Sequence, residues 1–252
     1  FRVAQLNLIV STTQIPLTFK RDFTQCDDAV SGAGSNTDGI SSFDFSVVTN
    51  QIQSIFPVGQ QLDITYYRNL ADALAEKNSI SDISNYRNIG YPNTQNIYIR
   101  VDSRLNNDCL GLGSHITLTV EPIPIVQSMK QNHCDDDQDG LYAFETSSIQ
   151  ANLLNGITNV TVSYFDQNNN SLPSPLPNPF TTASQTLKVV VKNNTPTACS
   201  FDTTLQFIVD DLPEAFPIAS SLTTVCDDET DPVLQDGKYT FDTSSFQTTI
   251  LG

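Results

Sequence analysis

Short runs in which apolar and polar residues alternate recur along the chain. They lie at residues 62–66, 95–101 and 116–120, and again at 160–164, 185–191 and 205–209. An apolar side chain at every second position is typical of a β-strand with one buried face. Several short strands with turn residues between them predict an all-β fold of immunoglobulin-like antiparallel β-sandwiches. A β-solenoid is the alternative, but its period is far shorter.

Two short helices are predicted within this β pattern. Residues 70–77 are good helix formers, and a helical turn is expected at 148–154. The segment 168–179 is rich in Asn, Ser and Pro and therefore predicts an exposed loop.

A motif recurs three times and divides the chain into repeats. Cys-Asp-Asp begins at Cys26, Cys134 and Cys226. An Asp-Gly pair follows in each copy, at Asp38-Gly39, Asp139-Gly140 and Asp236-Gly237. A Phe with an acid beside it comes next, at Phe43-Asp44, Phe144-Glu145 and Phe241-Asp242. We expect each Phe to anchor a core and each acid to face the opposite side of the strand.

The spacing of these motifs predicts four segments. Residues 1–18 resemble only the last strand of a repeat, and residues 218–252 resemble only the start of one. Complete β-sandwich repeats are predicted at residues 19–125 and 126–217. We therefore expect tandem repeats that belong to a longer protein.

The charge of the chain is strongly negative. Twelve Lys and Arg stand against 28 Asp and Glu, which gives a net charge of −16. Such a surface repels phosphate backbones, so no nucleic-acid partner is expected. No apolar run is long enough for membrane insertion of this segment. Divalent cations are the natural counter-ions.

The cysteines indicate an oxidising compartment. Each complete repeat holds one cysteine at its start and one before its last strand. Five thiols admit many pairings. We predict one disulfide per repeat, Cys26–Cys109 and Cys134–Cys199, and leave Cys226 without a partner in this sequence. Paired cysteines at equivalent places favour an extracellular location.

The second Cys-Asp-Asp motif has the pattern of half a calcium loop. Asp135, Asp137 and Asp139 alternate before a glycine, as in D-x-D-x-D-G loops. Closely spaced carboxylates repel one another unless a cation lies between them. The sequence therefore predicts structural Ca²⁺ here, with Glu145 as a further ligand.

The other two copies are less regular. Their candidate ligands are Asp27, Asp28 and Asp38 in the first copy, and Asp227, Asp228 and Asp236 in the third. The alternative interpretation is a solvated acidic turn, or Asp side chains that cap backbone amides.

Catalytic chemistry has little support. Paired carboxylates can hydrolyse glycosides, but these acids recur in every repeat and crowd one turn. The two histidines, His115 and His133, have no counterparts in the other copies, and there is no G-x-S-x-G motif. We predict that the chain is not an enzyme.

The order of motifs resembles a known type of repeat. Cys-Asp-Asp, Asp-Gly and Phe-Asp-x-Ser, followed by the stretches at 64–73 and 95–101, are similar to repeats of giant Bacteroidota proteins. These are the flavobacterial cell-surface gliding-motility adhesins of the SprB type. The resemblance implies export by the type IX secretion system and partnership with the gliding machinery at the bacterial cell surface.

Two functions are compatible with this resemblance. The first is a structural stalk that consists of neighbouring repeats of the same chain and supports cell adhesion. The second is a carbohydrate-binding module for surface polysaccharide. Tyrosines that could form a sugar platform cluster in the longer repeat, at Tyr66, Tyr67, Tyr86, Tyr91 and Tyr98.

Overall fold

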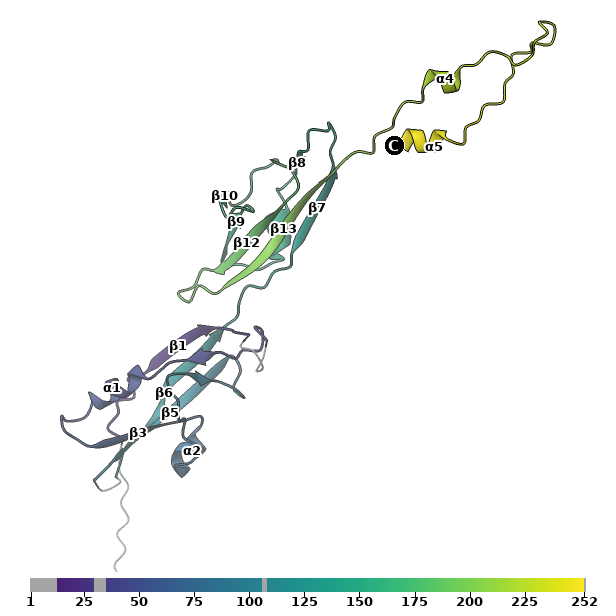
Figure 1. The fold of residues 1–252 in the computed structure, drawn as a ribbon. Coiled ribbons are helices and arrows are strands. Elements are labelled where there is room, and N and C mark those ends of the chain that lie inside the picture. Colours follow the sequence, from purple (N-terminus) through teal and green to yellow (C-terminus); the bar gives the residue numbers. More distant parts are fainter. Residues whose placement is uncertain (1–12, 30–34, 106–107, 252) are drawn as a thin grey trace, which may run out of the picture. The chain divides into compact units, whose positions relative to one another are not determined.

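The computed structural model describes residues 13–29, 35–105 and 108–251, and its secondary structure is dominated by β-strands (Figure 1). A four-stranded sheet has the order β1-β6-β5-β3, and a five-stranded sheet has the order β10-β9-β12-β13-β7. A two-stranded sheet accompanies each of them, β2-β4 and β11-β8. The predicted all-β fold of immunoglobulin-like sandwiches is confirmed.

The first group of elements spans residues 21–121. Its strands are β1 (Arg21–Cys26), β2 (Ser42–Phe43), β3 (Leu62–Tyr67), β4 (Tyr86–Arg87), β5 (Thr94–Ser103) and β6 (Cys109–Glu121). Its helices are α1 (Val47–Gln53) and α2 (Leu70–Ala75). Helix α2 confirms the prediction at 70–77. Sequence reasoning missed α1, whose Val48 and Ile52 lie one turn apart on its buried face.

The second group spans residues 129–210. Its strands are β7 (Met129–Cys134), β8 (Tyr142–Phe144), β9 (Val160–Phe165), β10 (Ser171–Leu172), β11 (Phe180–Thr182), β12 (Gln185–Asn193) and β13 (Ser200–Asp210). Helix α3 (Ile149–Leu154) lies where a helical turn was predicted. After this second group, residues 211–251 contain two short helices, α4 (Ser220–Thr223) and α5 (Phe246–Leu251).

The pairing of the first strand with the last is the same in both groups. Strand β1 pairs in parallel with β6, and its end residue Cys26 lies opposite Glu121. Strand β7 likewise pairs in parallel with β13, and Cys134 lies opposite Asp210. These two parallel pairs depart from the expected antiparallel pattern, whereas β3 pairs with β5 and β5 with β6 in antiparallel register.

Aromatic residues form the centre of each core. Phe43 and Phe144 are each 1% exposed, which confirms their predicted role as anchors. Phe144 packs against Phe207 with ring centroids 4.7 Å apart and the rings tilted. The third copy differs, because Phe241 is 41% exposed and no strand is found between residues 211 and 251.

Two compact units can be distinguished by their contacts. Residues 150–164 and 189–203 group with the chain up to residue 127, and residues 128–149, 165–188 and 204–252 form the other unit.

No helix in the described part of the chain has the length and apolar character that crossing a membrane requires.

Candidate functional site

A disulfide connects the two groups of strands. Cys26 at the end of β1 bonds to Cys199 just before β13, with their Cα atoms 5.5 Å apart. Both cysteines belong to the first compact unit. The predicted pairs Cys26–Cys109 and Cys134–Cys199 are therefore wrong, and Cys109, Cys134 and Cys226 are free thiols.

The parallel strand pairs explain why a bond within one repeat cannot form. Cys26 lies opposite Glu121, the last residue of β6, whereas Cys109 is the first residue of that 13-residue strand. At about 3.3 Å per residue the two ends of β6 lie roughly 40 Å apart. A disulfide needs Cα atoms within about 7 Å. The same argument separates Cys134, opposite Asp210, from Cys199 at the other end of β13.

Glu121 adds a polar contact beside the disulfide. Its Oε1 accepts hydrogen bonds from Asn193 Nδ2 at 2.7 Å and Thr195 Oγ1 at 2.6 Å. Asn193 Nδ2 also donates to the carbonyl oxygen of Pro122. Burial opposes ionisation of Glu121, but bonds from Thr195, Asn193 and Thr197 outweigh it and lower its pKa. The Glu121 carboxylate therefore adds hydrogen bonds between the same two groups of strands that the Cys26–Cys199 disulfide links covalently.

The three acidic turns share one hydrogen bond across all copies. The first Asp of each Cys-Asp-Asp accepts from the amide of the distant glycine: Asp27 from Gly39 at 2.8 Å, Asp135 from Gly140 at 2.6 Å, and Asp227 from Gly237 at 2.7 Å. These glycines have φ of 72°, 79° and 73°. Only glycine adopts this left-handed conformation at low cost, which accounts for its recurrence.

Two further acids of each copy also accept hydrogen bonds from backbone amides. Each Asp that precedes a glycine accepts from the amide two residues ahead: Asp38 from Ile40, Asp139 from Leu141, and Asp236 from Lys238. Each acid that follows the recurring Phe accepts from the backbone amide of the Ser two residues ahead: Asp44 from Ser46, Glu145 from Ser147, and Asp242 from Ser244. The acids are thus turn-forming residues, as the alternative interpretation expected.

Only one set of predicted ligands comes together among the described residues. The carboxylates of Asp135, Asp137 and Asp139 lie within 4.8 Å of one another. Glu145 is not part of this group. Asp135 is 3% exposed, and its carboxylate already accepts bonds from several backbone amides.

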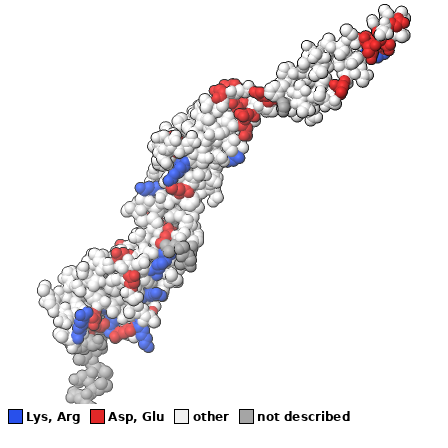
Figure 2. Space-filling view, in the orientation of Figure 1, with Lys and Arg blue, Asp and Glu red and all other residues white. Residues whose placement is uncertain are grey.

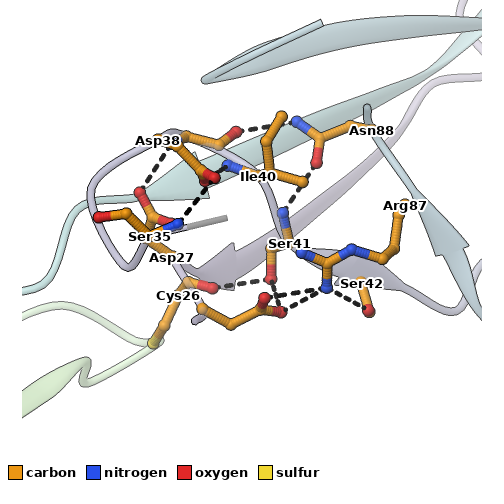
Figure 3. Close-up of polar contacts among 11 residues, drawn as sticks. Cys26, Asp27, Ser35, Asp38, Ile40, Ser41, Ser42, Arg87 and Asn88 are labelled. Carbon is orange, nitrogen blue, oxygen red and sulfur yellow. Dashed lines mark hydrogen bonds and ion pairs between the residues drawn. The ribbon is translucent and has the colours of Figure 1, made fainter. Parts of the chain in front are cut away.

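The first copy uses its acids differently, as Figure 3 shows. Asp28 forms an ion pair with Arg87 at 2.9 Å and accepts a bond from Ser41. Asp38 accepts from the amide of Ser35 at 3.1 Å. Burial raises the pKa of Asp27 despite its bond from Gly39. Arg87 therefore neutralises one of the carboxylates of this turn.

The third copy lies in the exposed segment after β13. Asp236 pairs with Lys238 at 2.7 Å, and Asp227 accepts from Glu229 as well as Gly237. Asp228 borders the same turn and was also a predicted ligand. In Figure 2, acidic side chains gather in clusters, while basic side chains are scattered.

The tyrosines of the first repeat do not make a sugar platform together. Tyr66, Tyr67 and Tyr86 are buried. The hydroxyls of Tyr66 and Tyr86 bond to Thr49 and Gln95, so these side chains belong to the core. The pattern that suggested a carbohydrate site is therefore largely a core pattern.

These features define a class of protein: tandem β-sandwich repeats that share a capped acidic turn and are joined by a disulfide. A family model described as the Flavobacterium inter-domain disulphide bond domain matches residues 22–124 and 130–213. The chain belongs to this family. Disulfide-bonded repeats of this kind function outside the cytoplasm.

The solved structures to which the chain is similar include fragments of animal cadherins. Human mucin-like protocadherin EC1-2 is 11% identical, with 77% of this chain and 97% of that chain covered, at a TM-score of 0.23. Drosophila N-cadherin EC1-4 is 8% identical, with 76% and 48% covered, at a TM-score of 0.25. No curated protein was found to match the chain.

The capped turn predicts a stability that depends on pH. Burial opposes the charge of Asp135, but bonds from the amides of Gly140, Asp137 and Gln138 outweigh it and lower its pKa. The ionised form therefore stabilises the fold above the unfolded pKa of about 3.9, and this contribution is lost as pH falls through the lower folded pKa. Asp135→Asn should lower the melting temperature at pH 7, and the difference from wild type should shrink below about pH 4.

Asp136→Asn serves as the matched control. Asp136 is an exposed neighbour, and its negative charge raises the pKa of Asp137 less than that of Asp139 does. Its removal should leave the melting temperature unchanged or slightly higher. Thermal unfolding followed by circular dichroism measures both variants. Equal melting curves for Asp135→Asn and wild type at pH 7 would show that the turn does not depend on this carboxylate.

Calcium binding at Asp135, Asp137 and Asp139 stays a prediction of the sequence pattern. A bound ion at tenfold its Kd would stabilise the fold by about 1.4 kcal/mol. Calorimetry on EDTA-stripped protein should then show heat on Ca²⁺ addition and a higher melting temperature, both lost in the double variant Asp137→Asn, Asp139→Asn. Absence of heat together with an unmoved melting temperature would contradict the prediction.

Proposed function

We propose that this chain is part of the stalk of a large flavobacterial cell-surface adhesin, without enzymatic activity, in which successive repeats are covalently linked. The observation that carries the proposal is the Cys26–Cys199 bond between the two groups of strands. A bond placed between repeats limits how they can separate, which suits a spacer that holds a binding region away from the cell.

The repeat boundaries of the proposal are 19–125 and 126–217, with partial repeats at 1–18 and 218–252. Because the two repeats have equivalent strand pairs, we expect the free thiols to form equivalent disulfides with neighbouring repeats. Cys134 corresponds to Cys26, since each ends a first strand opposite the last residue of the final strand. Cys109 begins the long final strand β6, and Cys199 directly precedes the corresponding strand β13. We expect Cys134 to bond to the following repeat and Cys109 to the preceding one.

Accessibility agrees with these partners. Cys134 and Cys226 are exposed, and Cys109 is partly exposed. A thiol at such a site can reach a cysteine of a neighbouring repeat without unfolding its own sheet. The resemblance to gliding-motility adhesins supports export by the type IX secretion system and a role in surface attachment.

Mapping of disulfides tests the covalent linkage. Protein released from intact cells should be blocked with a thiol reagent, digested without reductant and analysed by mass spectrometry. We expect a Cys26–Cys199 peptide pair and no blocked thiol at Cys109 or Cys134. A Cys26–Cys109 pair, or full alkylation of Cys109 and Cys134, would contradict the linkage between repeats.

Deletion of residues 19–217 from the parent protein distinguishes a stalk from a binding module. A stalk should lose reach but keep ligand binding by the purified protein, so that attachment falls only where a long reach is needed. A binding module should lose ligand binding itself. Robust binding of the isolated chain on a glycan array would contradict the stalk.

A further inference from the structure

The disulfide closes a covalent ring that contains most of the strands. Cys26 ends β1, and Cys199 directly precedes β13. All strands from β2 to β12 therefore lie on the ring, and β1 and β13 are attached to it from outside. The bond spans a sequence separation of 173 in a chain of 252 residues.

Without the bond, tension on the chain would shear a parallel strand pair in each repeat. Tension would enter the first repeat near Gln14, whose amide donates to the carbonyl oxygen of Leu110 in β6, pass along β1 from Arg21, and leave at Glu121 of β6. These strands pair in parallel from Arg21↔Ile116 to Cys26↔Glu121. Pulling them in opposite directions along their axes loads all the hydrogen bonds between them at once.

The second repeat has the same geometry. Tension would enter at Met129 of β7 and leave at Asp210 of β13, and these strands pair in parallel from Met129↔Leu205 to Cys134↔Asp210. Both repeats, if reduced, therefore resist tension through backbone hydrogen bonds between their first and last strands.

We propose that the Cys26–Cys199 bond is a mechanical bypass that carries tension past both sheets. Tension runs from Arg21 along β1 to Cys26, across the two sulfur atoms to Cys199, and along β13 to Asp210. Each of these strands is pulled from both of its own ends. The force is thus borne by covalent bonds, and the hydrogen bonds to β6 and β7 are not sheared.

The bypass also limits how far the chain can lengthen. Unfolding inside the ring brings no gain in end-to-end distance, so tension does no work on it and does not favour it. At about 3.3–3.6 Å per residue, the disulfide keeps roughly 600 Å of extended chain length inside the ring, where stretching cannot release it. Only about a third of the 252 residues remains extensible. The load path follows from the bond and the strand registers, and its biological use rests on the proposed stalk function.

Force spectroscopy on the full chain tests the bypass. Handles are attached enzymatically at the two ends, and the chain is stretched in optical tweezers with and without dithiothreitol. The reduced chain should show two force peaks, one for each repeat, that together release about 600 Å. The oxidised chain should show neither peak and extend to about a third of the reduced length.

Single substitutions separate the bond from general effects of thiols. Cys26→Ser, stretched without reductant, should behave like the reduced wild-type chain. Cys134→Ser, which removes a free exposed thiol, should behave like the oxidised wild type. Should Cys26→Ser not fold, the comparison of oxidised and reduced wild type still decides.

Two results would overturn the proposal. An oxidised chain that releases as much length as the reduced chain would show that tension does not pass through the bond. A reduced chain that lengthens without force peaks would refute the shear geometry. Deletion of the repeats in cells tests the stalk function separately, so failure of one does not imply failure of the other.

Discussion

The parallel pairing of the first strand with the last determines how these repeats can be connected. It places the cysteine that ends the first strand at the end of the sheet where the chain leaves the repeat. The cysteine before the last strand lies at the opposite end. The two thiols of one repeat therefore face different neighbours, and the disulfide has to join repeats. Cys26–Cys199 follows from this constraint.

The recurring acids stabilise the turn that follows each of these cysteines. The carboxylates of Asp27 and Asp135 hold the chain just after the cysteine by accepting from Gly39 and Gly140. Such bonds are assisted by the negative charge and are stronger than those of neutral acceptors. They fix the direction of the chain where it leaves β1 or β7. These acids thus have a structural role in the turn.

Covalent and non-covalent forces have separate roles in this arrangement. Buried side chains such as Phe43, Phe144 and Phe207 stabilise the sheets. The disulfide, with Glu121 beside it, connects them. In the proposed bypass, the bond that carries tension is therefore separate from the contacts that fold each sheet.

The sequence by itself determined the β pattern, the two short helices at α2 and α3, the recurring motif and the buried Phe43 and Phe144, because local periodicity and repetition report on burial. It did not reveal α1, whose β-branched Val47 and Val48 favour strands until tertiary packing buries Val48 and Ile52. It also misassigned the disulfide and read core residues such as Tyr66 and Tyr86 as a surface. Only the tertiary structure decided these points, because cysteine spacing carries no information on strand direction. The two cysteines of each repeat occupy equivalent positions in the sequence and therefore looked like partners. The parallel pairs β1-β6 and β7-β13 place them at opposite ends of the sheet.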